Sequence, residues 1–301
     1  MRHNGIALVL VLWVLTLLTV MALGLTAAQR TETALSDNHV SAARFRALAD
    51  AALAYTVLVF AMPPPEATDP EAAAWLPNGV PRPWRIAGSD LQIRVTNETS
   101  RIDLNQATPE LLAALLVALG AEDAVAESVA AAIVDWRDED DLTLLNGAED
   151  RDYRDAGRTI GAKDAPFVIA EELLQVIGMT PELYERLAPE VSVDIDDANF
   201  EERFASAAAV AALEGIPLDE AQARVAERDA PLFEDSGGPR FVDRGGPLYR
   251  IEVGEVGRGR LGRRMEALIE TTPGEQPPYR VRWRRFGLTN APPPSSELRS
   301  D

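Results

Sequence analysis

The residues best suited to chemistry in this chain are carboxylates, and they crowd one short stretch. They are Asp138, Glu139, Asp140, Asp141, Glu149, Asp150, Asp152 and Asp155. Like charges this dense repel one another unless a cation or solvent offsets them. Calcium takes roughly six to eight oxygen ligands from flexible carboxylate loops. From the residues alone, the stretch is equally well a cation site or a solvated acidic loop.

If a cation binds here, two pairs of acids are placed to share it. The candidate metal ligands are Asp138, Asp140, Glu149 and Asp150. A single residue separates Asp138 from Asp140, and this spacing lets both carboxylates converge from one turn. Gly147 permits the chain to fold the second pair back onto the first. The loop is not an EF-hand, because Thr143 stands at its sixth position, where that motif needs glycine.

Other residue types offer little for catalysis. Cysteine is absent, and the histidines are His3 and His39, so thiolate chemistry, histidine general-base catalysis and zinc binding by histidine are excluded. A glycosidase needs two carboxylates held across a sugar-sized cleft, which adjacent acids in one loop do not supply. The chain also has no P-loop, dinucleotide glycine pattern or nucleophile elbow. We predict that it is not an enzyme.

The charge balance argues against a nucleic-acid partner. The formal net charge is −19 and the pI is about 4.6, whereas nucleic-acid binding requires a basic face. Arginines cluster near the end of the chain, where they are explained as the solvent-exposed face of the predicted strands. They are Arg258, Arg260, Arg263, Arg264, Arg280, Arg282, Arg284 and Arg285.

The chain that must position these residues begins with an apolar run. No charged residue falls within Ile6–Ala28, and the run is long enough to span a bilayer as one helix. Helix-compatible sequence continues to about Phe60, where three prolines at 63–65 end it. The outer half has an apolar stripe at three- and four-residue spacing. Its members are Phe45, Leu48, Ala52, Tyr55 and Val59.

Short strands and capped helices follow. Residues 63–90 are predicted to be an irregular segment, and alternation predicts strands at 91–96, 248–253, 265–271 and 279–286. Helices are predicted at 109–119, 123–136, 171–177, 181–187, 200–213 and 218–226. The second of them is expected to bury Val125, Val129, Ile133 and Trp136. An echo of residues 103–107 in residues 194–198 suggests a duplicated unit, and the proline-rich tail from 290 is predicted to be disordered.

The amino terminus carries a family resemblance. A short basic leader ending in Gly5, directly before the apolar run, resembles the processing site of type IV prepilins and pseudopilins. In that family a prepilin peptidase cuts after the glycine and methylates the new terminus, which implies Gly5 and Ile6 as the processing site here. A signal peptide would instead be cut after the apolar run, where the sequence stays helical. An uncleaved single-span anchor is the other alternative.

Leu10 is a departure from this family's pattern. Pilin-like proteins usually have Glu at this fifth mature position, where it is thought to pair with the subunit ahead. A carboxylate in an apolar bundle is costly unless paired, so an apolar residue indicates a subunit with nothing ahead of it. This feature and the chain length resemble the K-type minor pseudopilins of the type II (general) secretion pathway. The matching motifs are Ile102–Asn105, Asp135–Asp140, Gly147–Asp150 with Tyr153, and Glu171–Leu174.

The resemblance implies an α+β fold. A pilin-like long N-terminal helix would pack on a small antiparallel sheet, with a large inserted all-α domain of SAM-like or helix-hairpin-helix units. The implied divisions are 1–5 leader, 6–28 transmembrane half of the helix, 29–103 and 237–288 pilin domain, 104–236 inserted domain, and 289–301 tail.

The implied function is a non-enzymatic minor pseudopilin at the fibre tip, helping to start assembly for protein secretion. Its expected partners are I- and J-type minor pseudopilins, the major pseudopilin and the prepilin peptidase. It would lie in the inner membrane with its N-terminus cytoplasmic and its C-terminal domain periplasmic, and the acidic loop would bind calcium. The alternative is a membrane-anchored helix-hairpin-helix protein that binds nucleic acid, although Glu171, Glu172, Glu182 and Glu185 surround the hairpin at 176–180.

Overall fold

The structure, a computed structural model, describes residues 4–62, 75–195, 200–230, 243–256 and 262–289. The chain forms two compact units, Met1–Ala54 and Tyr55–Asp301. The predicted domain boundary at 236 and the predicted tail from 290 lie outside the described residues. The predicted domain divisions therefore stay predictions.

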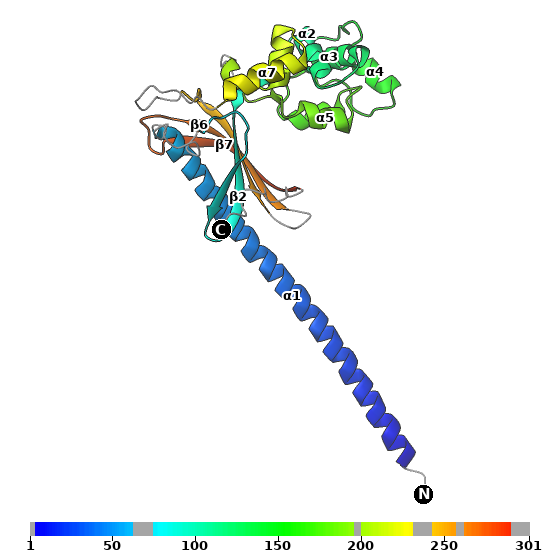
Figure 1. Cartoon of the computed structure of the whole chain (residues 1–301). Coiled ribbons are helices and arrows are strands. Elements are labelled where there is room, and N and C mark those ends of the chain that lie inside the picture. The colour runs from blue at the N-terminus through cyan, green and yellow to red at the C-terminus, as the bar shows by residue number, and fades with distance from the viewer. Residues whose placement is uncertain (1–3, 63–74, 196–199, 231–242, 257–261, 290–301) are drawn as a thin grey trace. The chain divides into compact units, whose positions relative to one another are not determined.

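A single helix makes up the first unit. Helix α1 (Asn4–Ala61) is 58 residues long, about 87 Å at the usual rise per residue, and its last turns belong to the second unit. The predicted uninterrupted helix is confirmed (Figure 1). It is long and apolar enough to cross a membrane. Within the predicted stripe, Phe45 and Ala52 are buried, whereas Tyr55 is 40% exposed.

The second unit contains an antiparallel sheet. Its strands are β1 (Arg82–Ile86), β2 (Ser89–Asn97), β5 (Leu248–Glu255), β6 (Gly262–Thr271) and β7 (Tyr279–Thr289), in the order β1-β2-β5-β6-β7. Strand β2 pairs with β5 from Leu91 opposite Glu255 to Asn97 opposite Tyr249. Several short helices lie between these two strands in the sequence. The prediction that the early strand and the late strands share one sheet is confirmed.

Strand β1 corrects the prediction that residues 63–90 lack regular structure. The turn residues Ala87 and Gly88 have φ of 49° and 71°, and this tight turn pairs Ile86 with Ser89 and Arg82 with Ile93. Two successive positive φ values fit the two-residue hairpins that follow strand twist. Alanine is a poor marker of such a turn and Pro83 interrupts the alternation, so β1 forms because β2 offers it a partner.

One face of the sheet is apolar and receives the last turns of α1. Ile93 and Ile251 are completely buried. The Tyr55 ring stacks on Trp84 at 5.3 Å between centroids, and Phe60 meets Tyr249 edge-on at 5.3 Å. Such aromatic pairs add to the stabilisation from buried area. The predicted packing of the helix on the sheet is thus seen at residues 55–61.

Short helices form the inserted part of the chain. They are α2 (Pro109–Ala118), α3 (Asp123–Arg137), α4 (Asp150–Asp155), η3 (Ala170–Gln175), α5 (Pro181–Leu187), η4 (Glu202–Phe204), α6 (Ala207–Glu214) and α7 (Leu218–Asp229), and Figure 1 shows α2, α3, α4, α5 and α7 gathered together. Thr108 caps α2 by accepting from the Leu111 N–H at 3.3 Å, and Thr180 caps α5 in the same way with Leu183 at 3.2 Å. These caps confirm the predicted starts.

The helices share one apolar core. Leu112, Leu115, Ile133 and Tyr153 are completely buried within it. Val125, which we predicted to be buried, is 42% exposed. The buried face of α3 runs through Ala126, Val129, Ile133 and Trp136 instead, because contact with α2 decides which side of α3 faces inward.

A charged layer joins the helices to the polar face of the sheet. Glu98, in the turn η2 (Glu98–Ser100), is completely buried. Arg250 of β5 donates from Nε to Glu98 Oε2 at 2.8 Å and from a terminal nitrogen to Glu266 at 2.9 Å. Ser192, in the short strand β4 (Val191–Ser192) that pairs in parallel with β3 (Ile102–Asp103), also donates to Glu98. Arg101 lies 3.7 Å from Glu98 through Nε.

Candidate metal centre

The loop between α3 and α4 brings together acidic side chains from two helix ends. Helix α3 ends at Arg137, and the Asp138 N–H donates to the Val134 carbonyl at 3.0 Å. Glu149 stands at the N-cap of α4, where its backbone N–H donates to Asp152 Oδ2 at 3.0 Å. One end of each helix therefore presents a carboxylate to the same loop.

Asp135, a completely buried residue of α3, organises this loop. Its carboxylate accepts from the Leu144 N–H at 3.2 Å and from the Ala148 N–H at 2.8 Å. A Cβ on Gly147 would lie 2.0 Å from Asp135 Oδ2, so only glycine fits there. Burial raises the pKa of Asp135 to about 6, and the charge of Asp138 adds to that rise. Gly147 does let the loop close, as predicted, but it closes on Asp135.

Two predicted ligands carry buried carboxylate oxygens without hydrogen-bond partners. Both side-chain oxygens of Glu149, and Oδ1 of Asp138, are buried and accept no hydrogen bond from any described residue. Burial raises the pKa of Glu149 to about 7, and repulsion from Asp135 and Asp138 adds to the rise. A buried carboxylate without donors is costly, and a cation among its oxygens removes that cost. These oxygens fit a bound cation.

Asp164 lies near the same carboxylates, on a loop outside the acidic stretch 138–155. The backbone N–H groups of Lys163 and Asp164 both donate to the Trp136 carbonyl at 3.1 Å, which fixes this loop to the end of α3. Burial raises the pKa of Asp164, with repulsion from Asp150 and Asp141. Asp164 has a φ of 51°, and neither motif nor periodicity marks it in the sequence.

The four predicted ligands do not form one closed cage. Asp140 is exposed, and its Oδ1 accepts from the Leu142 N–H at 2.9 Å. Asp150 lies against Gly161, where a Cβ would be 1.7 Å from its Oδ1. Among the described residues, no three His, Cys, Asp or Glu side chains are arranged to hold a metal as they stand. The ligand set Asp138, Asp140, Glu149 and Asp150 stays a prediction.

The predicted processing site lies near the start of α1. Gly5 and Ile6 fall within its first turns, and Leu10 is 63% exposed on the helix surface. Cleavage between Gly5 and Ile6 stays a prediction.

The predicted helix-hairpin-helix turn faces inward. Gly178 has a φ of 85°, and a Cβ on it would lie 2.9 Å from Val129 of α3. The Ile177 N–H donates to the Tyr153 hydroxyl at 3.2 Å. A phosphate-binding hairpin presents its backbone N–H groups to the ligand, whereas this turn uses them within the helical core.

The known proteins that are similar in sequence to this chain are all described as protein K of type II secretion systems. The family model of type II secretion system protein K matches residues 93–194. Protein K of Klebsiella pneumoniae is 29% identical over 212 residues, which cover 65% of this chain and 64% of that protein. Protein K of Dickeya chrysanthemi is 38% identical over 79 residues, 26% of this chain and 21% of that protein. The matched segments thus span less than two thirds of either relative's length.

A solved structure shares the fold. It is the crystal structure of the GspK-GspI-GspJ complex from the enterotoxigenic Escherichia coli type 2 secretion system, with a TM-score of 0.55 and 18% identity over 84% of this chain and 98% of that chain. The match confirms the α+β class, with a long N-terminal helix, an antiparallel sheet and an inserted helical domain. None of these similarities supports the nucleic-acid-binding alternative. In residues 93–194 and in its fold, this chain is thus similar to protein K of type II secretion systems.

Proposed function

We propose that the chain is a minor pseudopilin of a type II secretion system, a structural subunit without enzymatic activity. The observation that carries the proposal is that one chain joins the protein K domain at residues 93–194 to the apolar helix α1. In a fibre of such subunits, helices of this kind pack side by side and the folded units lie outside. The proposed role of this subunit is structural: other subunits bind it, and it is assembled into the fibre.

A place at the fibre tip follows from Leu10. The helix surface around it is apolar, with Leu8, Leu12 and Trp13 exposed beside it. A carboxylate at this position needs a cationic partner from a subunit ahead, and without one it stays buried and charged in an apolar bundle. An apolar residue is therefore stable where no subunit is ahead. The tip subunit would also help to start assembly of the fibre for protein secretion.

The membrane placement rests on α1 and its flank. A single span with Arg2 before it keeps the amino terminus cytoplasmic, because basic residues mark the side that is retained. The sheet and the helices would then lie in the periplasm, with α1 in the inner membrane before assembly.

The partners are proposed from the matched structure, which is a complex of a K subunit with I and J subunits. This chain would pair with its own I- and J-type minor pseudopilins and rest on the major pseudopilin. The prepilin peptidase would act on it first.

Calcium is the proposed ligand of the acidic loop. Glu149 and Asp138 supply the buried oxygens without partners, and Asp140 and Asp150 complete the predicted set. These are hard oxygen donors on a loop, which calcium accepts in flexible geometry. The bound ion would neutralise the crowded charges and hold the end of α3 to the start of α4.

Removal of the processing glycine tests the proposed function. Gly5→Val in cells with a prepilin peptidase should leave an unprocessed chain and reduce secretion, because the peptidase is expected to recognise the glycine directly before the cut. Mass spectrometry of the amino terminus measures the processing. Gly24→Val is the matched control, since no atom lies within 4 Å of a Cβ at that helical glycine, and it should be processed normally. A wild-type chain that keeps residues 1–5 contradicts the pseudopilin proposal.

Leu10→Glu tests the tip position. The variant should insert into the membrane but lower secretion, because an unpaired carboxylate in the bundle costs on the order of several kcal/mol. Leu10→Met keeps the apolar surface and should secrete normally. If Leu10→Glu secretes at the wild-type level, the absence of Glu at this position has nothing to do with a place at the tip.

A further inference from the structure

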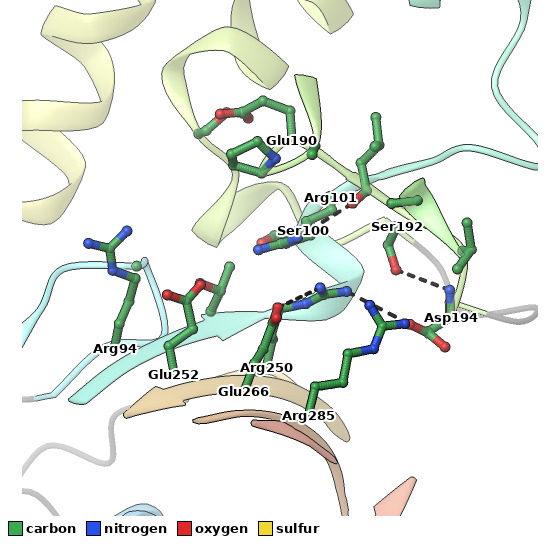
Figure 2. A pocket seen from close by; sticks show the side chains of 18 of the residues that line it. Arg94, Ser100, Arg101, Glu190, Ser192, Asp194, Arg250, Glu252, Glu266 and Arg285 are labelled. Carbon is green, nitrogen blue, oxygen red and sulfur yellow. Dashed lines mark hydrogen bonds and ion pairs between the residues drawn. The ribbon is translucent and has the colours of Figure 1, made fainter. Parts of the chain in front are cut away.

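A cavity of about 550 Å³ lies between the polar face of the sheet and the helical part of the chain. Arg94 of β2, Glu252 of β5 and Arg264 of β6 form part of its floor, and Arg101 and Glu190 belong to the facing wall. Figure 2 shows Arg94, Arg250, Glu252, Glu266 and Arg285 rising from the strands. Neither the fibre role nor the calcium loop uses this cavity.

Three arginines that line the cavity have donors without hydrogen-bond partners among the described residues. The Nε groups of Arg101 and Arg264 are buried and have no hydrogen-bond partner among the described residues. The Arg101 side chain is only 8% exposed, and its Nε lies 3.7 Å from Glu98 Oε2, within ion-pair range but too far for a hydrogen bond. The side chain of Arg94, whose backbone pairs with Glu252 in the sheet, forms no hydrogen bond or ion pair with any described residue, and it is an exposed part of the cavity lining. Buried donors without acceptors are costly.

The acids of the cavity are, by contrast, mostly engaged. Glu266 accepts from Arg250 at 2.9 Å, Glu252 lies 3.2 Å from Arg264, and Asp194 accepts from the Trp283 ring N–H at 3.1 Å. Glu190 accepts from the Ser206 hydroxyl. No cavity-lining carboxylate oxygen of the described residues is buried without a partner. Among the buried polar atoms of the described residues that line the cavity, the unmet hydrogen-bonding capacity is therefore on the donor side.

We propose that the cavity binds a small oxyanion, a carboxylate or a phosphate group. A guanidinium presents its N–H groups as a planar fork that matches both groups and forms short, charge-assisted hydrogen bonds with them. Arg94 and Arg264 come from the sheet, and Arg101 comes from the segment that leads into the helices. An oxyanion bound by all three arginines would link the sheet to the helical part of the chain. Its binding would make the connection between these two parts more rigid.

Isothermal titration calorimetry on the full chain in detergent micelles tests the site. Inorganic phosphate and succinate are titrated separately in calcium-free buffer at constant ionic strength, with chloride as the balancing anion. Saturable binding of phosphate alone assigns a phosphate group, binding of succinate alone assigns a carboxylate, and binding of both assigns oxyanions in general. Absence of saturable binding by either anion overturns the proposal.

Variants locate the binding. Arg94→Gln should raise the dissociation constant about tenfold or more, as loss of a charge-assisted contact requires, and its side chain takes part in no hydrogen bond or ion pair with another described residue. Arg280→Gln is the matched control, because this strand arginine is 65% exposed and lies outside the cavity lining; its binding should be unchanged. Equal affinity in the wild type and Arg94→Gln means an adventitious ion only and overturns the proposal.

Discussion

Calcium should raise the free energy of unfolding of this protein, and a chelator should lower it. An ion that binds the folded state alone stabilises it by mass action, by about 2.7 kcal/mol at a hundredfold excess over the dissociation constant. The physical reason is the buried, unpartnered carboxylate oxygens of Glu149 and Asp138. Magnesium should substitute poorly, because it demands tight octahedral geometry and gives up water reluctantly. Thermal and urea denaturation of the full chain in detergent micelles measure both effects.

Substitutions separate a binding loop from a solvated one. Asp138→Asn with Asp140→Asn, and Glu149→Gln by itself, should abolish the calcium response. Without calcium, Glu149→Gln should match or exceed the stability of the wild type, because it removes a buried charge that others repel. Asp219→Asn, an exposed change on α7, is the control and should keep the full response. A denaturation curve indifferent to calcium and to chelator returns the loop to a solvated acidic segment.

Glu98→Gln should destabilise the second unit by about 3 to 5 kcal/mol, the usual cost of breaking a buried ion pair. Glu98 is completely buried and accepts from both Arg250 and Ser192. The substitution keeps the shape but leaves Arg250 and the buried Arg101 without its charge. Urea denaturation measures the loss as a lower midpoint. Glu275→Gln is the control. Glu275 is 55% exposed and pairs with Arg280, so its substitution should lower the free energy of unfolding by no more than about 1 kcal/mol.

The effect of Glu98→Gln should depend on pH. Burial alone would raise the pKa of Glu98, but Arg101, Arg250 and Ser192 together lower it below its ordinary value. A carboxyl whose pKa is lowered in the folded state contributes stability above its unfolded pKa, about 4.3 for Glu, and loses it as the pH falls through the folded value. The difference between wild type and variant should be largest near neutral pH and shrink in acid. A difference that stays constant from about pH 7 to pH 3 would show that the charge of Glu98 is not its source.

Local sequence determined the elements whose cause is local. The apolar run predicts the helix α1, because a segment in a bilayer must satisfy its backbone hydrogen bonds within itself. Thr108 and Thr180, each followed by proline, start α2 and α5 through contacts within one turn. Alternation of Leu91, Ile93 and Val95 gives β2 one apolar face. Strand β1 and helix α4 were missed, because one depends on pairing with β2 and the other begins inside the acidic loop.

The acidic loop was likewise predicted in part from the sequence and in part seen only in the tertiary structure. Composition alone pointed to the loop that contains Asp138 and Glu149, since so many like charges require an explanation. The hydrogen bonds that Asp135 accepts from the loop, and the place of Asp164 beside it, emerged only from the tertiary structure, which turns the end of α3 toward a loop fixed by the Trp136 carbonyl.

The sequence by itself determined the long apolar helix, the strand and helix pattern, and the acidic loop, because each depends on residues close together in the chain. The tertiary structure alone decided which carboxylates lose their partners and which arginines face a cavity. Burial and distance between remote segments control both, and Glu98 with Arg250 shows why, since residues 152 positions apart form one buried contact.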